Sequence, residues 1–135
     1  MNPASTPKQK LLAFINAKAN MIAEKCTLPY IDNADIAEVE SWPDDTCESV
    51  WTRLCIKIER GNILNPERDA FGANACPWCQ KHIDTGCSEC LYGLRHGICT
   101  RHDSRYAQIG CYMPQDWITY GKLVELIKEI EGGKV

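Results

Sequence analysis

The chain has 135 residues, of which 44% are hydrophobic and 24% charged, and it carries a net charge of −3. These values are typical of a single globular domain and argue against a protein that coats nucleic acid through its charge. No run approaches the roughly 18 apolar residues of a membrane span. The first apolar segment, residues 11–23, is interrupted by Asn16, Lys18 and Asn20. It is therefore a poor signal-peptide core, and we expect a cytoplasmic protein.

The first predicted helix begins after Thr6, with Pro7 at its first position and Gln9 placed to close a capping box. Pro29 stops it. Its apolar positions recur at helical spacing and form one broad face, made of Leu11, Leu12, Phe14, Ile15, Ala19, Ile22, Ala23 and Cys26. We expect Cys26 to be a buried thiol of this face.

Residues 32–48 are acidic and contain no base; the acids are Asp32, Asp35, Glu38, Glu40, Asp44, Asp45 and Glu48. We interpret them as a solvated short helix with capping acids. Docking of a basic partner and a carboxylate-bound metal are the alternatives. Asp45 is a good N-cap for a following helix that Gly61 ends. One face of that helix is predicted to be core, namely Cys47, Val50, Trp51, Leu54, Cys55 and Ile58.

The rest of the chain alternates between weak and strong helix signals. Asn65-Pro66 predicts a short helical turn that ends at Gly72, and residues 91–113 show no sustained apolar period, so we expect them to be mostly irregular. The last helix is predicted to start around 113–116 and to stop at Gly132. The fold class is therefore mainly α: one small domain over residues 1–135, with helices in 6–72, a cysteine-rich segment at 73–113 and a C-terminal helix at 114–132.

The most informative stretch lies in that cysteine-rich segment. Nine cysteines in an intracellular protein indicate metal or redox chemistry, and an odd number does not suit a fully paired disulfide framework. Two Cys-x-x-Cys turns and a fifth cysteine occur within 24 residues, and two such turns can supply the four thiolates of a tetrahedral site. The predicted metal ligands are Cys76, Cys79, Cys87, Cys90 and Cys99.

Which four of these five sulfurs bind is left open by the spacing. Cys76, Cys79 and Cys90 belong to every set that we favour, and Cys87 and Cys99 compete for the fourth position. Three histidines are further candidates for a Cys3His site, namely His82, His96 and His102. Thiolates favour Zn²⁺ or an iron–sulfur cluster. Zinc is the expected metal, because the stretch does not match the compact ferredoxin run; an iron–sulfur cluster is the alternative.

The pattern Cys-x-x-Cys, then Gly86-Cys87-Ser88-Glu89-Cys90, then Gly97-Ile98-Cys99 and Tyr106 resembles a five-cysteine motif of small prokaryotic and phage proteins. In that motif a proline often follows the second pair, where this chain has Leu91. The resemblance implies that the five cysteines act as one unit, and it implies no activity.

The sequence predicts an accessory or protein-interaction module with a structural zinc ion, and not an enzyme, because a four-thiolate site is closed and activates water poorly. Bases and aromatics at 92–106, including Arg95, Arg101 and Arg105, suggest a zinc-knuckle nucleic-acid module as an alternative. The acids at 32–48 and the bases at 92–106 form two patches of opposite sign. Such patches favour another protein, or a second copy of this chain, as the partner over nucleic acid.

Overall fold

In the computed structural model, the described residues are 6–68, 70–99, 101, 103–113 and 117–132. Within them the chain forms seven α-helices: α1 (Pro7–Ala23), α2 (Asn33–Ser41), α3 (Asp44–Leu64), α4 (Pro77–Lys81), α5 (Leu91–His96), α6 (Arg105–Tyr112) and α7 (Tyr120–Glu131). Short 3-10 turns at Ala73–Ala75 and Cys87–Glu89 precede α4 and α5. The expectation of a mainly helical domain is confirmed.

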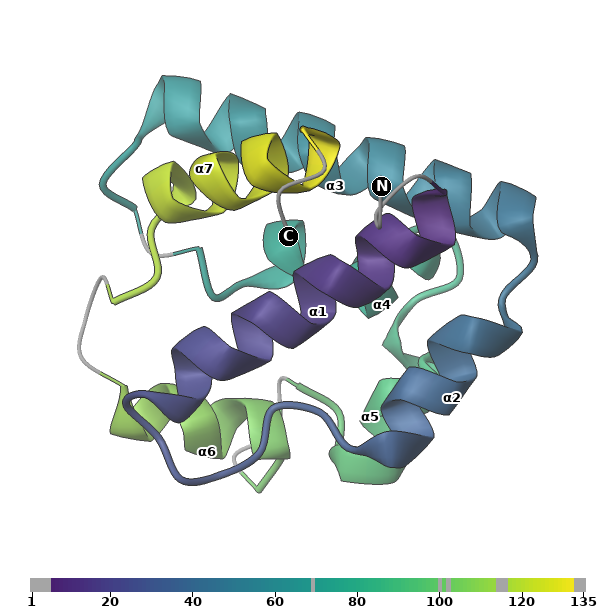
Figure 1. Cartoon of the computed structure of the whole chain (residues 1–135). Coiled ribbons are helices and arrows are strands. Elements are labelled where there is room, and N and C mark those ends of the chain that lie inside the picture. The colour runs from purple at the N-terminus through teal and green to yellow at the C-terminus, as the bar shows by residue number, and fades with distance from the viewer. Residues whose placement is uncertain (1–5, 69, 100, 102, 114–116, 133–135) are drawn as a thin grey trace.

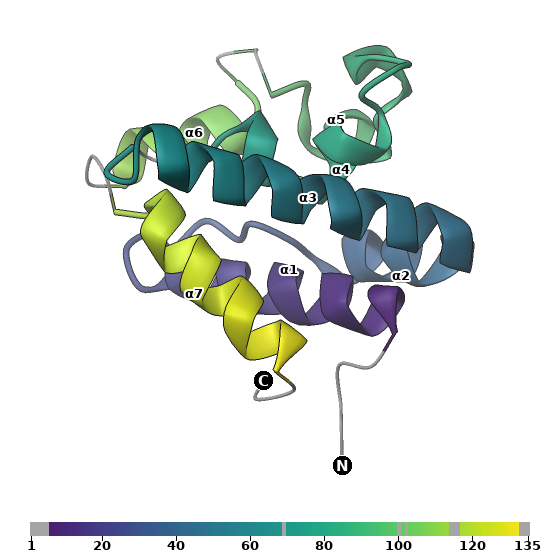
Figure 2. The ribbon, with the colours of Figure 1, turned by 90° about the horizontal axis from the view of Figure 1, so that it is seen from above.

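The long helix α3 lies at the centre of the arrangement. It packs against α1 and α7 on one side and against α4 on the other. Figure 2 shows these two sides, with the short helices α4, α5 and α6 gathered opposite α1 and α7. The helix α2 lies beside the start of α1 and reaches toward α5 (Figure 1). No helix among the described residues combines the length and apolar character that a membrane span requires.

The helix α1 begins as its sequence predicts, but it ends at Ala23, before Pro29, so that Ala23 is exposed and the buried Cys26 lies beyond the helix. The Thr6 side chain accepts a hydrogen bond from the Gln9 N–H, and the Gln9 side chain accepts one from the Thr6 N–H, both at 3.1 Å. The face that α1 turns inward is fully buried at Leu11, Phe14, Ile15 and Ile22. Burial of each such side chain contributes about 1.5–3 kcal/mol, so the packed face stabilises this helix more than its caps do.

The helix α3 differs from its prediction at both ends. It begins at Asp44 after Pro43, and it continues past Gly61 to Leu64. Gly61 therefore lies inside the helix and does not end it. The absence of a side chain at Gly61 lets Tyr120 pack against the helix. A Cβ atom there would lie 2.6 Å from ring atoms of Tyr120 in α7. The predicted core face is confirmed for Cys47, Val50, Trp51, Leu54 and Ile58, whereas Cys55 is only half-buried.

Two further predictions are wrong. Residues 91–113 are not mostly irregular, because they contain α5 and α6; Ser104 caps α6 by accepting a hydrogen bond from the Ala107 N–H at 3.1 Å. The described part of 65–72 is not helical, and the Ala70 N–H instead donates to the Ile118 carbonyl at 2.6 Å. The last helix starts at Tyr120 with Thr119 as its N-cap, and residues 114–116 lie outside the described residues.

Candidate metal centre

The two turns that carry the cysteines share one local geometry. Cys76 is the N-cap residue of α4 and Cys90 is the N-cap residue of α5, both in extended conformation. The backbone N–H groups of Trp78 and Cys79 are hydrogen-bonded to the Cys76 sulfur. Those of Tyr92 and Gly93 are hydrogen-bonded to the Cys90 sulfur. Amide donors of this kind favour the charged thiolate, which is the form that binds a metal.

Four of the five predicted ligands interact electrostatically in every pairwise combination: Cys76, Cys79, Cys90 and Cys99. A hydrogen bond from the Cys79 thiol lowers the pKa of Cys76 to about 6 and raises the pKa of Cys79. Burial, followed by the charge of Cys76, raises the pKa of Cys99 to about 12. One thiolate therefore suppresses ionisation of the others, and a bound cation would let all four ionise.

Cys87 has a different position from the other four. It lies on the 3-10 turn before α5 and is exposed. Besides burial, its charge raises the pKa of Cys99. It still belongs to the same site, because it lines a pocket of about 240 Å³ together with Trp78, Cys79, His82, Ile83, Gly86, Cys90, Gly93, Ile98 and Cys99. Four of the five predicted cysteines thus line one pocket, and Cys76 adjoins it through its hydrogen bond with Cys79.

One unpartnered buried polar atom lies at this site. Among the described residues, the buried side-chain nitrogen and oxygen atoms without a hydrogen-bond partner are Tyr30 Oη, Gln80 Oε1 and His82 Nε2. Tyr30 interacts electrostatically with Cys76 and Cys79, Gln80 follows Cys79 in the chain, and His82 lines the pocket. Each such group costs free energy, so the buried Nε2 of His82 indicates that the pocket can accept a partner for it.

His82 is the histidine that the structure brings to the pocket. Its Nδ1 lies 3.1 Å from the Thr85 hydroxyl, which leaves the buried Nε2 for another partner. Burial, followed by the charge of Lys81, lowers the pKa of His82 and so favours the neutral ring that can bind a metal. His96 lies in a different cluster, and His102 lies outside the described residues.

The sulfur atoms are spread more widely than in a closed zinc site. Among the described residues, no three cysteine sulfurs lie within 4.8 Å of one another. A tetrahedral Zn²⁺ with Zn–S bonds of about 2.3 Å requires sulfur–sulfur distances of about 3.8 Å. Zinc would therefore have to draw the two turns together. A [4Fe–4S] cluster spaces its cysteine ligands more widely, because each of the four cysteine sulfurs binds a different iron.

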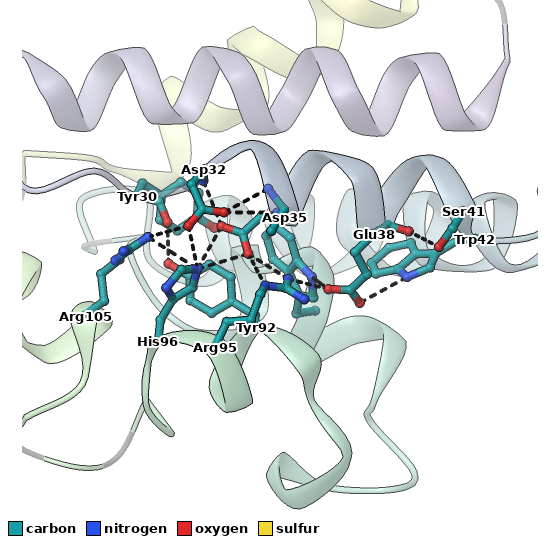
Figure 3. Close-up of polar contacts among 12 residues, drawn as sticks. Tyr30, Asp32, Asp35, Glu38, Ser41, Trp42, Tyr92, Arg95, His96 and Arg105 are labelled. Carbon is teal, nitrogen blue, oxygen red and sulfur yellow. Dashed lines mark hydrogen bonds and ion pairs between the residues drawn. The ribbon is translucent and has the colours of Figure 1, made fainter.

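The acidic segment is solvated at five of its seven acids, and Asp32 caps α2, but the other two acids are directed inward. Asp35 and Glu38, one helical turn apart on α2, are buried, and Figure 3 shows them directed at α5. The Arg95 guanidinium lies 2.6 Å from Asp35 and 2.5 Å from Glu38. Glu38 also accepts hydrogen bonds from the indole N–H groups of Trp42 at 3.2 Å and Trp78 at 3.0 Å. Sequence reasoning missed this pairing, whose local signal was two acids spaced by three residues.

A second set of contacts extends the same network to α6. His96 Nε2 lies 2.9 Å from Asp35 Oδ2, and Arg105 lies 3.6 Å from Asp32. Despite the opposing effect of burial, a hydrogen bond from the Asp35 N–H and the charges of His96 and Arg105 lower the pKa of Asp32. The ligand atoms of Asp32, Asp35 and His96 lie within 4.8 Å of one another. The two arginines already supply positive charge there, so we interpret the cluster as an ion network.

This network positions the cysteines. Arg95 and His96 end α5, whose N-cap is Cys90, and Trp78 lies in the turn between Cys76 and Cys79. The acids of α2 therefore hold both cysteine turns against the bundle. The predicted basic and acidic patches contact each other through Arg95 and Arg105, so part of their charge is paired within the chain.

The remaining cysteines lie outside the site. Cys26 and Cys47 are buried in the hydrophobic core, Cys55 is half-buried on α3, and Cys111 is exposed on α6.

Comparison of the chain with protein-family models, with curated proteins and with solved structures finds no match. The resemblance to the five-cysteine proteins stays a prediction, and the functional argument depends on the site itself.

Proposed function

We propose that this protein is a small metal-binding module in which Cys76, Cys79, Cys90 and Cys99 hold a structural zinc ion. The observation that carries the proposal is the convergence of these four thiols from two turns, whose N–H groups point at sulfur, and from the loop that carries Cys99. Cys87 lies at the edge of the site, and His82 is the candidate nitrogen ligand for a Cys3His site.

We propose a structural role because the helices of this segment are too short to be stable on their own. Its helices α4, α5 and α6 have 5, 6 and 8 residues, well below the roughly 12–15 residues at which isolated helices become even marginally stable. Structural zinc contributes roughly 10–16 kcal/mol of binding free energy, which rivals the stability of a whole domain. The ion would hold the two turns and the Cys99 loop as one unit.

The module is proposed to act through a protein partner and to carry out no reaction of its own. Four thiolates close the coordination sphere and leave no position for water. The surface that supports a partner is apolar: Ile83 beside the pocket and Leu91 and Leu94 on α5 are exposed by 53%, 44% and 64%. Self-association through the same side chains would appear as a concentration-dependent mass in sedimentation.

An iron–sulfur protein of electron transfer or redox sensing is the second candidate. The wide sulfur spacing and the pocket of about 240 Å³ between the cysteines favour it, because a cluster needs more room than one ion. In that case the same cysteines would bind the irons, and the apolar walls formed by Ile83 and Ile98 would limit access of water to the cluster.

Anaerobic purification followed by elemental analysis and an absorption spectrum separates the two candidates. The proposal predicts a colourless protein with about one zinc per chain. Brown protein that contains iron and acid-labile sulfide would replace it with the cluster. Protein that binds neither metal, even after reconstitution under reducing conditions, would contradict both.

A further inference from the structure

A lysine lies inside the protein next to the cysteine site. Lys18 occupies the inward face of α1, between Ile15 and Ile22, and only 1% of its surface is exposed. In the sequence this lysine interrupts an apolar segment. Burial of an ammonium group is costly unless negative charge or hydrogen-bond acceptors surround it, so its position calls for a physical reason.

The contacts of Lys18 lead to the first cysteine turn. Its Nζ donates a hydrogen bond to the carbonyl of Ala75 at 2.9 Å, and Ala75 immediately precedes Cys76. The same Nζ lies 5.2 Å from the ring centre of Tyr30 and 5.5 Å from that of Phe71, within the range of cation–π attraction. After the Cys79 hydrogen bond and burial, the charge of Lys18 is the next influence on the pKa of Cys76, and it lowers that pKa.

A thiolate-held metal needs positive charge in its surroundings. Four thiolates around one Zn²⁺ leave a net charge of −2, and a buried anion of this kind is destabilised unless neighbouring groups offset it. Groups that contact the ligands without binding the metal tune the metal affinity in this way. The N–H groups at Cys76 and Cys90 provide part of this compensation, and Lys18 provides a full charge on the buried side of the site.

We propose that Lys18 is a positioning residue of the metal centre, whose ammonium group offsets the negative charge of the thiolate-bound ion and fixes the Cys76 turn through the Ala75 carbonyl. This inference rests on the proposed function. It explains why a lysine lies in an otherwise apolar helix face.

The test uses the full chain with zinc or cobalt. Lys18→Gln removes the charge and keeps a hydrogen-bond donor, and Lys18→Met is a second neutral variant if the glutamine variant does not fold. Lys18→Arg keeps the charge, and Ile15→Val is a packing control on the same buried face. Zinc affinity is measured by competition with a coloured chelator, and Co²⁺ reports on the thiolates through its sulfur-to-metal charge-transfer bands.

We expect the neutral variants to bind zinc about 10- to 100-fold more weakly, with Lys18→Arg close to wild type. Their cobalt charge-transfer bands should move to lower energy, because loss of a nearby positive charge raises the sulfur donor levels. Ile15→Val should lower the melting temperature and move neither readout. Wild-type affinity and an unchanged cobalt spectrum in a folded neutral variant would overturn the role of Lys18, as would an arginine variant as weak as the neutral ones. A wild-type chain that binds neither ion would overturn the metal centre itself.

Discussion

Replacement of Arg95 by alanine tests whether the buried ion network holds the cysteine segment on the bundle. The Arg95 side chain is 25% exposed, whereas its partners are not: the side chains of Asp35 and Glu38 are 0% and 5% exposed. Removal of the guanidinium leaves the Asp35 and Glu38 carboxylates buried without their cationic partner. Asp35 then keeps His96, and Glu38 keeps the N–H groups of Trp42 and Trp78.

These remaining contacts set the size of the effect. Removal of one partner from a fully buried ion pair costs about 3–5 kcal/mol of unfolding free energy. The partial exposure of Arg95 and the surviving donors reduce this, so we expect a loss of about 2–3 kcal/mol. Arg101 is a matched control, because its pair with Asp103 is exposed by 66% and 73%. Its alanine variant should lose no more than about 0.5 kcal/mol.

Urea unfolding followed by circular dichroism measures both variants in the same buffer. A double-mutant cycle with Glu38→Gln should give a coupling of about 0.5–3 kcal/mol, as for residues of one network. Equal stabilities of the Arg95→Ala and Arg101→Ala variants would refute the reasoning. The acids of α2 would then not hold the cysteine turns in place.

Three further outcomes follow from the same structure. Removal of the metal by a chelator should expose residues 73–113 to proteolysis before α1, α3 and α7; simultaneous cleavage everywhere would contradict a local structural role. Hydrogen bonds from Lys10 and Trp51 lower the pKa of Glu131. The ionised Glu131 therefore stabilises the folded protein at pH values above its ordinary pKa of 4.5, and this contribution is lost as pH falls through the lowered pKa. The stability difference between wild type and Glu131→Gln should therefore shrink in acid, and a constant difference would contradict it. Serine at Cys26 or Cys47 should cost roughly 1–3 kcal/mol by placing an unpaired hydroxyl in the core while metal content stays unchanged.

Local signals predicted the bundle well. The capping box at Thr6 and the apolar spacing of α1 need no information from distant residues, and both are confirmed. The short helices α5 and α6 could not be predicted in this way, because contacts with distant elements stabilise them. The Tyr92 hydroxyl donates to the Tyr30 carbonyl, and the Tyr106 hydroxyl donates to the Phe71 carbonyl.

The candidate site shows the same division. The first Cys-x-x-Cys turn brings Cys76 and Cys79 together by local geometry, so their proximity was predictable from spacing, whereas the position of Cys99 depends on the fold. The ion network was not predictable in this way, since Asp35 and Arg95 are 60 residues apart and each is unremarkable alone. Lys18 was missed for a related reason. A single lysine in an apolar face usually extends its charge to the surface, and only tertiary contacts show that this one is buried beside Cys76.

The most direct test of the account compares serine at Cys99 with serine at Cys87. The two thiols lie in the same pocket, but Cys99 is half-buried and interacts with all three of the other proposed ligands, whereas Cys87 is exposed. Metal-to-protein ratios of the two purified variants therefore separate a ligand from a neighbour. The account predicts that Cys99→Ser loses the metal and that Cys87→Ser retains about one ion per chain. Retention of metal by Cys99→Ser, or its loss from Cys87→Ser alone, would contradict the proposed ligand set.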